Sequence, residues 1–88
     1  MPLRFSGRVR YWRSDPPGGL AVCDIPDALV ADLGGRRQRR VEGTINGSAF
    51  TGSTMLVAGG GFCVGLSKAA LGAARATVGD TAAIELSP

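Results

Sequence analysis

The chain has 88 residues, of which 44% are hydrophobic and 19% are charged, and its ten basic and seven acidic residues give a net charge of +3. This length and composition predict one small globular domain spanning residues 1–88 and exclude a disordered chain. Histidine is absent and there are two cysteines, which excludes histidine-based triads and metal sites as well as four-cysteine zinc sites.

The first part of the chain predicts two strands and one short helix. Apolar and polar residues alternate over residues 3–13, which is typical of a half-buried antiparallel strand with arginines on its solvent face. The Pro- and Gly-rich segment 15–19 predicts a loop, and residues 20–25 predict a second strand. Residues 26–33 predict a helix with proline at its start, ended by the glycines at 34–35.

The middle of the chain predicts a tight hairpin behind an arginine-rich segment. That segment, residues 36–40, leads into an alternating strand over residues 41–45. Asn46-Gly47 lies between this strand and the next one, residues 48–51. Both residues tolerate the positive φ that a two-residue hairpin turn requires, so the pair predicts such a turn.

The last part of the chain predicts a strand, a helix and a final strand. The apolar residues 55–58 are interpreted as either strand or buried loop, and residues 62–66 alternate as a strand. Ser67 is expected to cap a helix over residues 68–75, and residues 81–86 form the last strand. The chain therefore contains six short strands and two short helices.

Six short strands with Gly-rich turns predict a mostly β fold, namely a small closed or nearly closed barrel whose open ends are capped by the two helices. A chain of this size hides its sheet edges only by closure or by pairing. The sequence leaves open whether the barrel closes within one chain or through strand exchange in a homodimer.

Five segments, in this order, resemble a family of small bacterial β-barrel domains of unknown function that accompanies the YdeI/OmpD-associated (bacteriocin-protection) domain. They are Phe5-Ser6-Gly7-Arg8-Val9, Cys23-Asp24-Ile25-Pro26, Arg40-Val41-Glu42-Gly43-Thr44-Ile45-Asn46-Gly47, Gly60-Gly61-Phe62-Cys63-Val64 and Val78-Gly79-Asp80-Thr81. The chain departs from this family at the start of the second strand, where Gly19-Leu20-Ala21 replaces the usual aromatic residues. The resemblance covers nearly the whole chain and implies the fold, but the family has no established activity to carry over.

Residues 66–80 also resemble the helix-turn-strand of AbrB-like transcription-factor barrels, in which two chains interlock into one DNA-binding barrel. This second resemblance covers less than a third of the chain. It implies a double-split barrel as the alternative to a closed one, and nucleic-acid binding as the alternative function.

The residues predict a non-enzymatic binding module without cofactor or metal. No acid, lysine or thiol pair has a recognisable catalytic spacing, and Gly59–Gly61 matches no phosphate-binding motif. We expect the partner to be another protein or a second copy of this chain. The expected interaction surface is apolar and consists of Tyr11, Trp12, Met55, Leu56 and Val57.

The alternative function is an AbrB-like nucleic-acid-binding regulator. In that hypothesis Arg36, Arg37, Arg39 and Arg40 contact phosphates, whereas in the competing interpretation they form a solvated loop that protects an edge strand. No apolar stretch approaches the ~20 residues of a membrane span, and the N-terminal residues lack the apolar run of a secretion signal. We therefore expect a cytoplasmic protein in which Cys23 and Cys63 are free thiols.

Overall fold

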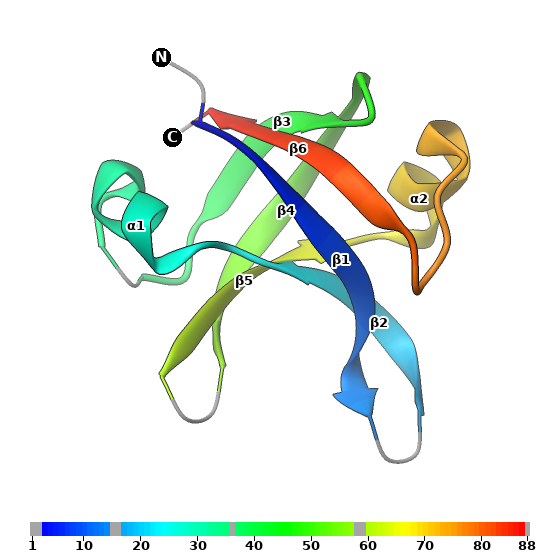
Figure 1. The fold of residues 1–88 in the computed structure, drawn as a ribbon, viewed down its shortest axis with the longest axis horizontal. Helices are drawn as coiled ribbons and strands as arrows, with labels where there is room; N and C mark the ends of the chain where they lie inside the picture. The colour runs from blue at the N-terminus through cyan, green and yellow to red at the C-terminus, as the bar shows by residue number, and fades with distance from the viewer. Residues whose placement is uncertain (1–2, 15–16, 36, 58–59, 88) are drawn as a thin grey trace.

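The computed structural model describes residues 3–14, 17–35, 37–57 and 60–87. Six antiparallel strands form a ring-shaped sheet with two short helices beside it (Figure 1), which confirms the predicted mostly β fold. The strands are β1 (Leu3–Ser14), β2 (Pro17–Asp24), β3 (Arg40–Ile45), β4 (Ser48–Val57), β5 (Gly61–Leu66) and β6 (Thr81–Ser87). The helices are α1 (Asp27–Val30), which continues into a 3-10 turn η1 (Ala31–Leu33), and α2 (Lys68–Ala74).

Each strand of the ring pairs with two neighbours. The order is β1-β2-β5-β4-β3-β6, and β6 pairs back onto β1 with Leu3 opposite Leu86. β6 also pairs with β3, with Ile45 opposite Ile84. β6 therefore lies between β1 and β3 and has one ladder on each side. All of these pairs form within a single chain.

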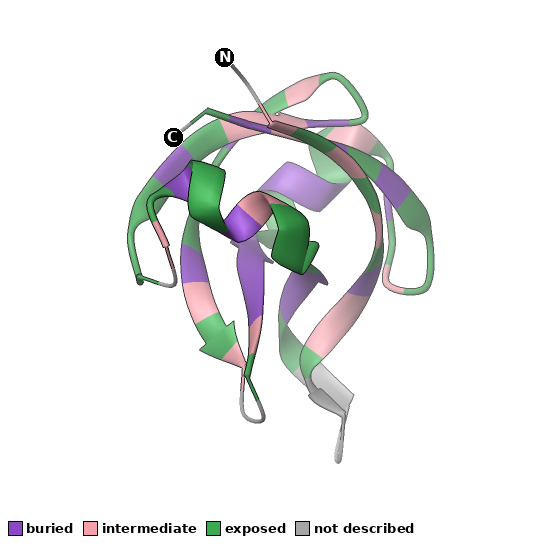
Figure 2. Ribbon diagram, turned by 60° about the vertical axis from the view of Figure 1, so that its left-hand side comes forward, coloured by how far each residue is buried: buried purple, intermediate pink, exposed green. Residues whose placement is uncertain are grey.

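The interior of the ring holds the main core. Along β3 and β6 buried inward positions alternate with more exposed outward ones (Figure 2), as the alternation in the sequence predicts, whereas β2 and β5 are buried on both faces. The helices lie on opposite sides of the ring (Figure 1) and add Leu33 from η1 and Leu71 from α2 to this core. The largest fully buried side chains include Phe62, Ile45 and Leu66.

The predicted turn and cap residues adopt the conformations that their chemistry favours. Asn46 and Gly47 have φ angles of 50° and 83° and connect β3 to β4, which confirms the hairpin. Gly34 ends η1 at a φ of 88°, and its N–H donates to the carbonyl of Ala31. Ser67 caps α2, since its Oγ accepts a hydrogen bond from the Ala70 N–H at 3.0 Å.

Two predicted boundaries differ from the structure because hairpins extend beyond the ring. The predicted loop 15–19 is shorter, since β2 already begins at Pro17, and a proline is tolerated as the first residue of a strand. The predicted strand 48–51 continues through the apolar run to Val57 as one strand, while Ala58 lies outside the described residues. The hairpins β1–β2 and β4–β5 therefore project as two arms on the same side of the ring (Figure 1).

One glycine is required by the close approach of two strands. Gly43 of β3 lies opposite Leu86 of β6, and a Cβ at Gly43 would overlap the backbone carbonyl of Glu85. No other residue type has room there, because the obstruction is backbone and cannot rotate away.

Candidate binding site

The sheet has a second, small apolar layer on its outer face. Val22 lies on the face opposite the main core, as does its cross-strand neighbour Arg10, yet Val22 is 0% exposed. Cys63 lies on the same outer face, opposite Met55 of β4, and is also 0% exposed. Neither Val22 nor Cys63 belongs to the core inside the ring. Outward side chains of β2 and β5 are therefore covered by other residues on the outside of the ring.

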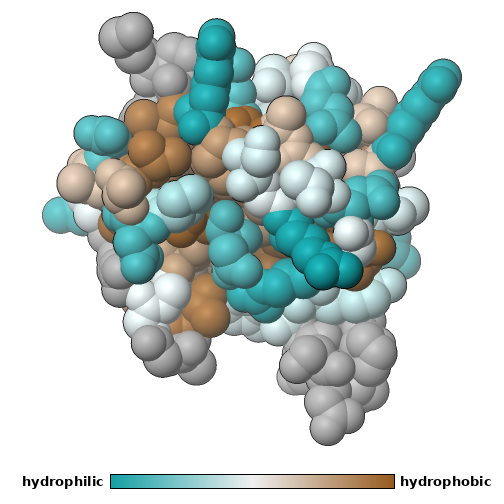
Figure 3. All heavy atoms as spheres, viewed as in Figure 1, coloured by the Kyte–Doolittle hydropathy of each residue, from teal (hydrophilic) through white to brown (hydrophobic). Residues whose placement is uncertain are grey.

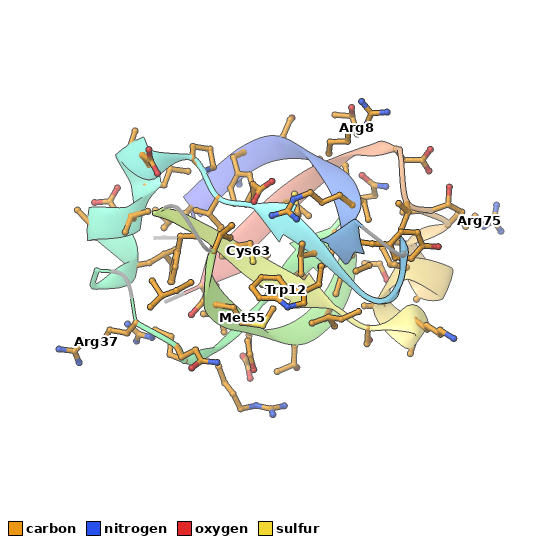
Figure 4. The ribbon with its side chains drawn as sticks, turned by 90° about the horizontal axis from the view of Figure 1, so that it is seen from below. Arg8, Trp12, Arg37, Met55, Cys63 and Arg75 are labelled. Atoms are coloured by element: carbon orange, nitrogen blue, oxygen red, sulfur yellow. The ribbon has the colours of Figure 1, made fainter. Side chains whose placement is uncertain are left out.

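Side chains from the two arms supply this cover. A Cβ on Gly65, which lies opposite Val22, would meet Met55 Cε at 3.3 Å and Leu20 Cδ1 at 3.8 Å. Met55 and Leu20 thus close over the bare backbone of Gly65. Figure 4, the view from below, shows Trp12 beside Met55 and Cys63 at the centre of this face.

A hollow of about 280 Å³ opens on this face, and we call it the outer groove. One part of its lining is apolar and the other part carries hydroxyl groups and one guanidinium. It is lined by Leu20, Arg40, Thr51, Gly52, Ser53, Met55, Gly65 and Ser67. Arg40 reaches this face because it lies opposite Ser53 at the start of the β3–β4 ladder.

Large apolar side chains remain exposed on both arms that flank the outer groove. Trp12 on β1 is 38% exposed, Leu20 on β2 is 43% exposed and Leu56 on β4 is 55% exposed. Among the described residues these are the exposed large hydrophobic side chains. Leu20 lines the outer groove, and exposed apolar side chains beside a hollow are typical of an interaction site.

The structure brings together part of the interaction surface expected from the sequence. Trp12 and Met55 lie together on the outer face (Figure 4), and Val57 shares the face of Met55 because it lies two residues further along β4. Leu56 has the opposite orientation on β4, opposite Phe62. Tyr11 is half-buried and pairs with the buried Ala21. The five residues therefore divide between two faces of the sheet.

Sequence reasoning did not assign Leu20, Gly65 or the polar lining residues of β4 to this site. Leu20 and Gly65 were interpreted only as positions of their strands, and Leu20 is exposed. A glycine at an outward position next to apolar residues was the available signal, since it leaves room for side chains of neighbouring strands.

The arginine-rich segment does not present one continuous surface. Arg36 lies outside the described residues, and Arg37 is exposed. Arg39 Nη1 donates to the carbonyl of Leu33 at 2.6 Å, so this guanidinium caps the end of η1, while Arg40 lines the outer groove. Figure 4 places Arg37 on a different side of the molecule from Arg8 and Arg75, so exposed arginines point in several directions.

The titratable groups on the strands beside the outer groove are paired or buried. The Arg10 guanidinium bonds both carboxylate oxygens of Asp24 at 2.8 Å, which lowers the pKa of Asp24. Burial raises the pKa of the Cys63 thiol on the outer face, and that of Cys23 in the core of the ring, to about 11. At neutral pH both thiols are therefore protonated.

Further hollows lie around β3 and β6. One, of about 330 Å³, lies between Arg4, Ser6 and Ala83, and another, of about 480 Å³, lies between Glu42, Thr44 and Phe50. A third, of about 300 Å³, adjoins the outer groove and shares Arg40 with it. Figure 3 shows that the face formed by β1 and β6 mixes hydrophilic and small residues with separate apolar patches. Within the described segments, no group of three or more Cys, Asp or Glu residues is placed to hold a metal ion.

Comparison with known proteins identifies a family and no activity. The family described as "Domain of unknown function (DUF1905)" matches residues 5–86, nearly the whole chain, which confirms the resemblance to a family of domains of unknown function. No curated protein matches the chain. In the part of the chain that the structure describes, no helix is long and apolar enough to cross a membrane.

Proposed function

This chain belongs to the DUF1905 family, and from that premise we propose that it is a non-enzymatic module that binds a protein partner on the outer groove and the arms beside it. In this proposal the ring acts as one closed barrel within a single chain. The observation that carries the proposal is that Leu20 and Met55 line one hollow on the outer face and that Leu20 and Trp12 remain largely exposed on this face.

The chemistry of these side chains suits a binding surface. Burying a large apolar side chain contributes about 1.5–3 kcal/mol, and tryptophan is among the residues that most often dominate an interface. Trp12 and Met55 come from different arms, so a partner seated on the outer face would bury both. The second apolar layer beneath them, with Val22 and Cys63 fully buried, gives that surface a rigid support.

Charge favours another protein over a second copy of this chain. The chain carries a net charge of +3, and Arg40, which lines the outer groove, is exposed. Two copies would place like charges close together, whereas an acidic partner would be attracted and would associate faster. Two free buried thiols, Cys23 and Cys63, support a reducing compartment such as the cytoplasm as its place of action.

The test is capture, identification and quantitative rebinding of the partner. A protein captured on the immobilised chain is identified, purified and titrated by calorimetry against the wild type and single variants. We expect Trp12→Ala and Leu20→Lys to weaken binding at least tenfold. The matched control is Ala83→Lys, which places the same charge at an exposed position of β6, and it should change the affinity less than twofold. Equal affinity of all three variants would refute the proposal.

The nucleic-acid alternative has less support, because Arg37, Arg39 and Arg40 have different surroundings and Arg39 is engaged at η1. Its test is the fluorescence anisotropy of labelled duplex and single-stranded DNA at two salt concentrations. Phosphate binding predicts an affinity that falls steeply with salt. It also predicts loss of binding when Arg36, Arg37, Arg39 and Arg40 are replaced by alanine.

A further inference from the structure

The outer groove has two chemically different parts. Leu20 and Met55 form an apolar part above Gly65, where only backbone lies beneath them. The other part is lined by Arg40 together with the hydroxyl-bearing Ser53. A ligand that fills this hollow must therefore present an apolar group and a polar or negative group a short distance apart.

Arg40 is the charged residue among those that line the outer groove. Its side chain is exposed, and its cross-strand neighbour is Ser53. Glu42 lies on the same face of β3 but is paired across the ladder with Thr51 and does not line this hollow. One guanidinium beside hydroxyl groups matches one carboxylate, which it binds through two parallel hydrogen bonds. A phosphate, with its greater charge, is usually held by a cluster of arginines.

The apolar surface beside the hollow favours a segment of protein as the occupant. The hollow measures about 280 Å³, which is room for one apolar side chain and a neighbouring polar group. The exposed Trp12 extends the apolar surface beyond the hollow, as a longer chain requires.

We propose that the outer groove recognises a short segment of the protein partner in which an apolar side chain is closely followed by an aspartate or glutamate. The apolar side chain lies against Leu20 and Met55 over Gly65, and the carboxylate binds Arg40. This inference rests on the proposed function and names the partner chemistry that the site selects.

The experiment selects ligands without assuming their sequence. A library of short random displayed peptides is selected on the intact chain, and the enriched peptides are synthesised and titrated. Trp12, the single tryptophan of the chain, reports binding through its fluorescence. The test variants are Arg40→Gln, which removes the positive charge, and Gly65→Ala, which adds a methyl group at the bottom of the groove, 3.3 Å from Met55 Cε.

Each test variant has a matched control. Arg37→Gln removes an exposed charge from the same segment, on another side of the molecule from Trp12 and Met55 (Figure 4). Gly72→Ala adds the same methyl group to an exposed glycine of α2, where a Cβ would have nothing within 4 Å. Thermal unfolding of each variant verifies that it is folded.

We expect the enriched peptides to share an apolar residue next to an acidic one. Arg40→Gln should weaken their binding about tenfold, as should replacement of the peptide's acid by its amide. Gly65→Ala should weaken binding at least threefold, and both control variants should bind as the wild type does. Peptides that bind Arg40→Gln and wild type equally, or a library that yields no binder, would overturn the inference. Peptides that bind Arg40→Gln as well as the wild type but lose affinity in Leu20→Lys would overturn it and leave the proposed function standing.

Discussion

Thr54 connects the arginine-rich segment to the sheet. Removing its hydroxyl group tests how much the hydrogen bonds of this buried side chain contribute to stability. It is the buried polar residue of the described chain, at 0% exposure. Its Oγ1 donates to the Arg37 carbonyl at 2.7 Å and accepts from the Arg39 N–H at 3.1 Å. The Thr54 backbone N–H also donates to the Arg39 carbonyl at 2.9 Å. Three hydrogen bonds therefore fix the segment that places the Arg39 guanidinium on Leu33 and starts β3.

The substitution Thr54→Val removes the hydroxyl and keeps the shape. Two hydrogen bonds at about 0.5–1.5 kcal/mol each give a loss of about 1–3 kcal/mol. The exposed side chains of Arg37 and Arg39 indicate that water reaches this segment, so we expect the lower half of that range, about 1–2 kcal/mol. For a chain of this length the midpoint of thermal unfolding should fall by about 5–12 °C.

The assay combines denaturant unfolding with amide hydrogen exchange. Thr54→Ser is the control, because it keeps the hydroxyl and loses only a buried methyl group, at about 1 kcal/mol. In Thr54→Val the Arg39 amide should exchange faster relative to global unfolding, whereas in Thr54→Ser its protection should follow global stability. The prediction is refuted if the free energy of unfolding of Thr54→Val lies within about 0.3 kcal/mol of the wild-type value, the usual error of additivity, and the Arg39 amide stays protected.

Three further variants or conditions test the strand crossing, the helix end and the thiols. Gly43→Ala should cost about 3 kcal/mol or prevent folding, because its Cβ would overlap the Glu85 carbonyl; a circular-dichroism melt matching that of the wild type would contradict this. Arg75 ends α2 at a φ of 54°, so Arg75→Gly should raise stability by up to about 1 kcal/mol in urea unfolding, and a loss of stability would count against the argument. Burial raises the pKa of Cys23 and Cys63 from 9.0 to about 11, so the stability that they contribute is complete below pH 9 and is lost as the pH rises to about 11. Urea titrations from pH 8 to 11 should show this loss in the wild type and a smaller one in Cys23→Ala, and identical slopes would argue against it.

Local chemistry in the sequence was enough to predict the elements of the ring. The alternation in residues 3–13 reports directly which side chains of β1 face the core, because strand geometry has a period of two. Asn46-Gly47 and Ser67 act through their own backbone and side-chain conformations, so their structural roles do not depend on distant partners.

The arms depend on pairing between distant segments, and local composition could not show them. Pro17 and the glycines after it read as a loop, but β1 pairs with them and extends the hairpin. In β4, the small residues before Met55 read as an interruption, whereas pairing with β3 and then β5 keeps the strand continuous. A sequence pattern indicates the local preference of a segment for strand or loop. Where a strand ends depends on the neighbouring strand with which it pairs.

The outer groove was only partly predictable for a related reason. Trp12 was identified because it breaks the polar pattern of its face, and Met55 because it begins an apolar run. Ala21, Val22 and Cys23 are buried in succession, since β2 is covered on both faces. Because three consecutive residues of β2 are apolar and buried, the sequence there does not alternate between apolar and polar residues. The face of β2 on which Leu20 lies could therefore not be predicted from the neighbouring residues.

The position of β6 between β1 and β3 also governs the order in which this protein can fold. Its last strand supplies the partner for its first, so the ladders on both sides of β6 remain unmade until residues 81–87 have been synthesised. Before that moment β1 and β3 each present an unpaired edge, which is the kind of surface that recruits other chains. Closure must also join segments from opposite ends of the sequence, and such contacts place a β-rich chain among the slower folders, in the range of about milliseconds to seconds. The nascent chain is therefore most exposed to aggregation just before β6 emerges.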